Sequence, residues 1–134
     1  MTEAIDYGVV LDLRTPLAEL RPRVEAALKE EGFGILTEID VQATLKKKLG
    51  VDVPAQLILG ACNPPLAHGA MELEPDVGLL LPCNVVLREL TGGRTRVAVM
   101  NVGRVLSVVD NAALRELAEQ VDARLRRVLD RLRD

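Results

Sequence analysis

Two short stretches decide how this chain folds: residues 60–65, Gly-Ala-Cys-Asn-Pro-Pro, and residues 80–84, Leu-Leu-Pro-Cys-Asn. They contain both cysteines of the chain, and its single histidine, His68, lies between them. Asparagine followed by proline is typical of a helix start, because the Asn side chain accepts a hydrogen bond from a free N–H and proline lacks only an N–H that the first turn does not use. We therefore predict a strand over residues 55–61 and a helix over residues 64–73.

Downstream, two apolar runs at residues 77–90 and 94–102 flank Gly92-Gly93, which predicts a β-hairpin. If the two glycines form the turn, Glu89 lies opposite Arg96, a favourable cross-strand pair. The same register places Asn84 opposite Asn101.

Upstream, residues 8–13 are rich in β-branched residues and predict a first strand. Thr15-Pro16 predicts a helix start, and helically spaced apolar residues continue to Gly32, with a distortion expected near residues 18–22 because of Pro22. A second strand is expected over residues 33–39. Asp40 then predicts the cap of a second helix that ends at Gly50.

The last segment, residues 110–132, predicts the longest helix, with apolar residues three and four apart. We expect this apolar stripe to pack on the chain's own sheet, and the alternative is a seam between two copies of the helix in a dimer. The predicted order is β-α-β-α-β-α-β-β-α, without repeats or linkers, in one domain over residues 1–134. That order indicates an α+β fold: a mixed sheet of about five strands with helices mainly on one face. A bare second face would need a partner, and a homodimer is the simplest one.

Composition excludes several classes of function. Tyr7 and Phe33 are the only aromatic residues, too few to stack nucleic-acid bases, and the net charge of −3 disfavours phosphate binding. The longest apolar run, residues 77–87, is shorter than the roughly 18 residues of a membrane span. With no signal peptide apparent, we expect a soluble cytoplasmic protein with reduced thiols. The abundance of Leu, Arg and Glu fits a thermophilic source.

Cys62 is the leading candidate for chemistry, because it ends a strand directly before a capped helix whose positive end would stabilise a thiolate. The alternative is a small apolar side chain that fills the junction between strand and helix. As an enzyme nucleophile or redox sensor, Cys62 would need His68 or Glu74 as proton acceptor.

The chain offers two further hypotheses. Metal or haem could bind at Cys62, His68, Glu72 and Cys83, although no pair has the spacing of a zinc motif. Our leading hypothesis is a small-ligand pocket lined by Cys62, Asn63, Cys83 and Asn84, with the N–H groups of the following helix available to an anion or carbonyl group. No particular cofactor is indicated, and a purely structural interaction module is the remaining reading.

Residues 60–64, Ala67 and residues 78–86 resemble the signature of domain-of-unknown-function family 302, and Glu-Gly-Phe-Gly at 31–34 also fits its pattern. The resemblance covers nearly the whole chain. It implies a compact α/β sandwich that forms a homodimer, and it supplies no activity. In that family a basic residue often follows the second cysteine, whereas Asn84 stands there in this chain.

Overall fold

An antiparallel sheet is the frame of the molecule, as seen in a computed structural model that describes residues 2–133. Within those residues the sheet has six strands in the order β1-β2-β6-β5-β4-β3. They are β1 Thr2–Ile5, β2 Gly8–Leu13, β3 Gly34–Asp40, β4 Gln56–Cys62, β5 Cys83–Glu89 and β6 Thr95–Met100. The predicted mixed sheet of about five strands is therefore corrected in two respects: β1 adds a strand, and every pairing is antiparallel.

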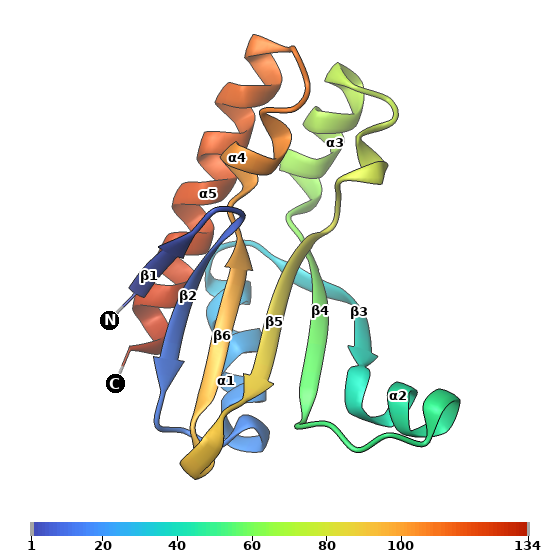
Figure 1. The fold of residues 1–134 in the computed structure, drawn as a ribbon. Coiled ribbons are helices and arrows are strands. Elements are labelled where there is room, and N and C mark those ends of the chain that lie inside the picture. The colour runs from blue at the N-terminus through green and yellow to red at the C-terminus, as the bar shows by residue number, and fades with distance from the viewer. Residues whose placement is uncertain (1, 134) are drawn as a thin grey trace.

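The helices confirm the α+β class and the prediction that they lie mainly on one face. They are α1 Leu17–Glu30, α2 Val41–Leu49, α3 Pro64–Leu73, α4 Val102–Leu106 and α5 Ala112–Leu132. Figure 1 shows α1 and α5 behind the sheet, α3 and α4 at one end of it, and α2 beyond the edge strand β3. No helix within residues 2–133 combines the length and the apolarity that crossing a membrane would require.

The core lies between the sheet and the two long helices. Alternate residues of the central strands, including Leu59, Val85 and Leu87, are fully buried because successive side chains of a strand point to opposite faces. The predicted apolar stripe of α5 packs here, from Leu114 to Leu132, so its packing on the chain's own sheet is confirmed.

Local signals set most helix ends. The side chains of Asp40 and Asn63 cap α2 and α3 as predicted, each accepting a hydrogen bond from the backbone N–H three residues on. Gly32, with φ of 85°, ends the α1 segment: its N–H bonds the oxygen of Lys29, and the N–H of Phe33 bonds that of Leu28, the two bonds of a Schellman motif.

The start of α1 differs from the prediction. Pro16 occupies the cap position without a side-chain hydrogen bond, and the hydroxyl of Thr15 instead accepts from Arg23. Pro22 lies inside a continuous helix, so the expected distortion does not interrupt it.

The predicted hairpin exists, but its register was wrong by one residue. Glu89 pairs with Thr95, and Leu87 with Val97. The turn is centred on Gly92, because the N–H of Leu90 bonds the oxygen of Arg94 and closes a loop with an odd number of residues. A slip of one residue exchanges the two faces of a strand. Arg96 does not face Glu89; it lies opposite Asp12 of β2 and bonds it at 2.7 Å.

Asn84 and Asn101 are therefore not partners. Asn84 pairs with Gly60 of β4 and is exposed. Asn101 lies beyond β6, where its side chain accepts from the N–H of Arg104 at 3.0 Å and caps α4. The prediction missed this short helix because it extended the strand to residue 102.

The face of the sheet opposite the helices, here called the open face, carries an apolar row. Cross-strand pairing aligns five residues from five strands: Val10, Ala98, Val86, Ile58 and Ile39. Three of them are partly exposed, and Ile39, on the edge strand, is 50% exposed. Val10, at the other end of the row, is buried. A second face without helices, the condition under which the sequence called for a partner, is thus present.

Candidate functional site

A cavity of about 150 Å³ lies between α3 and the ends of β4 and β5. Its lining residues come from six regions of the chain: Phe33 and Leu36; Ala61, Cys62 and Asn63; Leu66, Ala67, Ala70 and Met71; Gly78, Leu81, Pro82 and Cys83; Val102 and Leu106; Leu117 and Val121. Nearly all are apolar, and none is charged. Leu36 and Met71 are 65% and 48% exposed, so the cavity reaches the surface beside them. We call it the α3 cavity.

Both cysteines lie on the wall of the α3 cavity. Cys83 pairs across the sheet with Ala61, the residue before Cys62, so the two thiols come from adjacent positions on neighbouring strands. Both are free cysteines. Burial, with smaller contributions from Cys62 and Asp122, raises the pKa of Cys83 to about 12. Cys83 is therefore a protonated, unreactive thiol at neutral pH.

Of the four predicted ligand-binding residues, the structure gathers Cys62, Asn63 and Cys83 at the cavity but not Asn84, which is not among the lining residues. His68 and Glu72 are exposed and face each other on α3 at 3.2 Å. Neither lines the cavity. Within residues 2–133 no three His, Cys, Asp or Glu side chains are grouped as a metal ion requires.

The proton acceptors proposed for Cys62 are also elsewhere. His68 points to solvent beside Glu72. Glu74 follows the end of α3, where its carboxylate accepts a hydrogen bond from Asn111 at 3.1 Å. Neither residue contributes to the lining of the α3 cavity.

The start of α3 differs from an anion-binding helix terminus. Such a terminus binds anions through free backbone N–H groups. Here Pro64 and Pro65 have no N–H, and the N–H of Leu66 is bonded to the side-chain oxygen of Asn63 at 3.3 Å. The N–H of Ala67 bonds the main-chain oxygen of Asn63 at 2.8 Å. The prediction that this helix has N–H groups available to an anion or carbonyl group was therefore wrong.

One group of Asn63, its amide nitrogen Nδ2, has no hydrogen-bond partner among residues 2–133 and is accessible to solvent. The residue is 8% exposed and lines the cavity. Its Oδ1 is occupied by the helix cap, whereas no residue from 2 to 133 accepts a hydrogen bond from its Nδ2. Nδ2 lies beside Gly32, where an added Cβ would come within 2.9 Å of it. The cap was predicted from sequence, but the unused amide nitrogen was not.

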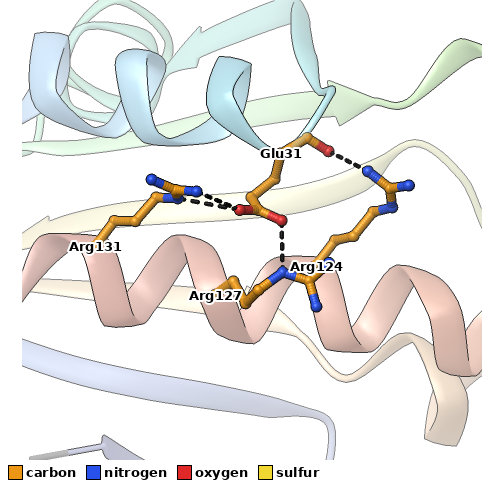
Figure 2. Close-up of polar contacts among 4 residues, drawn as sticks. All are labelled: Glu31, Arg124, Arg127 and Arg131. Carbon is orange, nitrogen blue, oxygen red and sulfur yellow. Dashed lines mark hydrogen bonds and ion pairs between the residues drawn. The ribbon is translucent and has the colours of Figure 1, made fainter.

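Figure 2 shows an ionic cluster that joins the end of α1 to α5. This cluster supports one wall of the cavity. The buried carboxylate of Glu31 accepts from Arg127 at 2.7 Å and from Arg131 at 2.8 and 3.0 Å. Its main-chain oxygen accepts from Arg124 at 3.1 Å. These bonds fix the residues directly before Phe33, a lining residue. The hydrogen bond from Arg127, together with Arg131, lowers the pKa of Glu31 despite its burial.

A second carboxylate holds the wall formed by α4. Asp122 of α5 accepts from the N–H groups of Val102 and Gly103 at 2.7 and 2.9 Å. A Cβ at position 103 would lie 2.7 Å from the Asp122 carboxylate, so the glycine permits this close approach. Val102, whose N–H makes one of these two bonds, lines the cavity.

Sequence reasoning did not identify Glu31 or Asp122 as supports of the site. A signal was present for the first, since Arg124, Arg127 and Arg131 are three and four residues apart and such residues share one side of a helix. Nothing in the sequence indicated that this side faces Glu31, almost a hundred residues earlier.

The fold and the site thus define a small α+β domain with an apolar cavity at one end of an antiparallel sheet. A family model described as "Domain of unknown function DUF302" matches residues 9–132, and the chain belongs to this family. It is similar to the crystal structure of an uncharacterized conserved DUF302 protein from Bacillus stearothermophilus, with 32% identity and a TM-score of 0.88 over 97% of this chain and 100% of that one. No curated protein matches the chain.

Proposed function

We propose that the protein binds a small, largely apolar molecule in the α3 cavity. The observation that carries this proposal is a cavity of about 150 Å³ whose lining has no charged side chain. A dry apolar cavity of about this volume in another protein binds benzene. A ligand therefore needs roughly the size of one six-membered ring.

The alternatives that rest on cysteine chemistry or metal have less support. A thiol enzyme would need a proton acceptor within hydrogen-bond reach of Cys62, and His68 and Glu74 are not on the lining. A metal or haem site would need ligands beyond Cys62 and Cys83, while His68 and Glu72 face solvent.

We further propose that the protein works in the cytoplasm. The two free thiols support this compartment, because thiols stay reduced there.

Thermal unfolding with and without benzene tests ligand binding. At ten times its dissociation constant, benzene should raise the free energy of unfolding by about 1.4 kcal/mol and the midpoint by several degrees. Ala67→Leu, which fills the cavity from α3, should abolish the shift. Ala123→Leu, on the exposed side of α5, should keep it. A wild-type midpoint that does not respond to benzene would refute the proposal.

We also propose a homodimer in which two open faces meet. The apolar row across that face supports it, and so does the distribution of charge beside the row. Asp12 on β2 and Arg96 on β6 already pair with each other at 2.7 Å, so the charges to consider beside the row are Glu3 on β1 and Arg88 on β5. A face that is acidic on one side and basic on the other can complement a second copy of itself, as a two-fold interface requires.

Sedimentation velocity tests the dimer. The wild type should sediment as a dimer, and Val86→Glu, which places a charge at the centre of the row, should sediment as a monomer with an unchanged circular dichroism spectrum. Ala123→Glu on the helical side is the matched control and should stay dimeric. A monomeric wild type at 100-micromolar concentration (roughly a hundred times a 1 μM Kd) would refute the interface.

A further inference from the structure

We infer that α2 is an arm of the dimer, whose lysines contact Glu3 at the β1 edge of the second copy. This inference rests on the proposed function, the dimer of two open faces, and names a second contact that sets how the two copies are placed. It starts from a helix that the chain itself does not bury.

The first step is the exposure of α2. The helix has nine residues, and none of them is buried. Its apolar stripe consists of Val41, Leu45 and Leu49; the first two are only partly buried, and Leu49 is 69% exposed. A helix of this length is marginal in water without tertiary packing. A contact with a second copy would therefore stabilise α2 where the chain's own packing is sparse.

The second step is the position of α2 relative to the apolar row of the open face. The row ends at Ile39 on the edge strand β3, and α2 begins directly after Asp40, beyond that strand, as Figure 1 shows. At the other end of the row, strand pairing places Glu3 of β1 beside Val10. The row thus has a carboxylate at one edge of the sheet and a helix with three lysines at the other.

The third step is the direction of the two-fold axis. Packed sheets keep their strand directions within about 30° of each other, so an axis between two open faces runs either along the strands or across them. An axis across the strands places Glu3 opposite Glu3 of the second copy, and like charges in contact are unfavourable. An axis along the strands exchanges the two edges. Glu3 of one copy then lies at the β3 edge of the other, where α2 begins.

The charged groups that meet in this arrangement are available. Lys46 is paired with Asp52 at 2.9 Å, whereas Lys47, Lys48 and Glu3 form no ion pair among residues 2–133. All three are exposed, so they can meet across an interface without breaking a bond within one copy. Complementary charges of this kind fix the orientation of an interface more than its affinity.

Charge reversal tests the arm. Sedimentation equilibrium would measure the dimer Kd of the wild type, Glu3→Lys, the double variant Lys47→Glu with Lys48→Glu, and all three changes combined. Each reversal replaces an attraction with a repulsion and should raise Kd about tenfold. The combined variant should return to within about threefold of the wild type, because the contact is restored with opposite signs. Lys29→Glu, at an exposed position on α1, is the matched control and should leave Kd unchanged.

The competing partner for Glu3 is Arg88 on β5. If Arg88→Glu restores the dimer of Glu3→Lys and the lysine reversals do not, the two copies are shifted and α2 is not an arm. Reversals that leave Kd unchanged, or that weaken the dimer without restoring each other, would also overturn the contact, and the open-face dimer would stand. If the wild type is monomeric, the proposed dimer fails and the inference fails with it.

Discussion

Two thiols share the wall of the α3 cavity, but their surroundings differ. Cys83 is buried at the start of β5, and its pKa is raised to about 12. Cys62 is only partly buried at the end of β4. Because the thiolate is the reactive form, burial protects Cys83 from reagents that reach Cys62.

Native protein treated with iodoacetamide near pH 8 should therefore take up one label, at Cys62. Peptide mass spectrometry identifies the site, and denaturant should expose the second thiol. Cys62→Ser should abolish native labelling, and Cys83→Ser should leave it intact. Equal labelling of both cysteines in the folded protein would contradict the difference that we infer between them.

Asn63 illustrates what a single residue reveals in sequence and what it does not. Its position before two prolines predicted a helix cap, and the structure confirms the cap. The same prolines remove the N–H groups that an anion would have used, a consequence that the sequence already contained. The free Nδ2, by contrast, depends on Gly32 and the end of α1, which only the fold brings next to it.

At the scale of elements, the ionic cluster around Glu31 joins the end of α1 to α5, close to the wall of the α3 cavity. The Arg127 hydrogen bond and the neighbouring Arg131 hold the pKa of Glu31 below its usual value. A lowered pKa in the folded state means that the stabilisation is complete above the unfolded pKa. It is lost as the pH falls through the folded pKa.

Glu31→Gln should lower the free energy of unfolding at pH 7 by about 1–3 kcal/mol, because hydrogen bonds to a charged group are weakened. The difference in free energy of unfolding between wild type and variant should shrink as the pH falls below about 4.3, the usual pKa of a glutamate side chain. Urea unfolding from pH 7 to pH 3 measures it. Glu30→Gln, at the exposed neighbouring position, should change little. A difference that stays constant over this range would contradict the assigned role of the carboxylate.

Elements with strong local signals were predicted well. Caps at Asp40 and Asn63 and the stop at Gly32 depend on neighbouring residues alone, and all three are confirmed. The hairpin register failed because two adjacent glycines allow more than one turn, and the choice between them follows from a loop bond between Leu90 and Arg94. Helix α4 was missed because five residues carry too little periodicity, and the carboxylate of Asp122 that supports it lies on another helix.

At the scale of the whole molecule, the two proposed surfaces are separate. The lining residues place the α3 cavity at the end of the sheet near α3 and α4. Figure 1 shows α1 and α5 on one side of the sheet, and the open face lies on the other side. The sequence predicted helices mainly on one face of the sheet, and a bare second face was the condition under which it called for a partner. The sequence predicted the cavity only as a pocket lined by Cys62, Asn63, Cys83 and Asn84. One of these four residues, Asn84, lies outside it.

The central claim is that the α3 cavity is a ligand site, and methyl NMR during a benzene titration tests it most directly. The result that we expect is a saturable, one-to-one change confined to methyl groups of the lining, such as those of Leu66, Leu81 and Val121. The methyl groups of Ile58 and Val86 on the open face should not move. Shifts that do not saturate, or that occur at Ile58 and Val86 and leave the cavity unchanged, would contradict the claim.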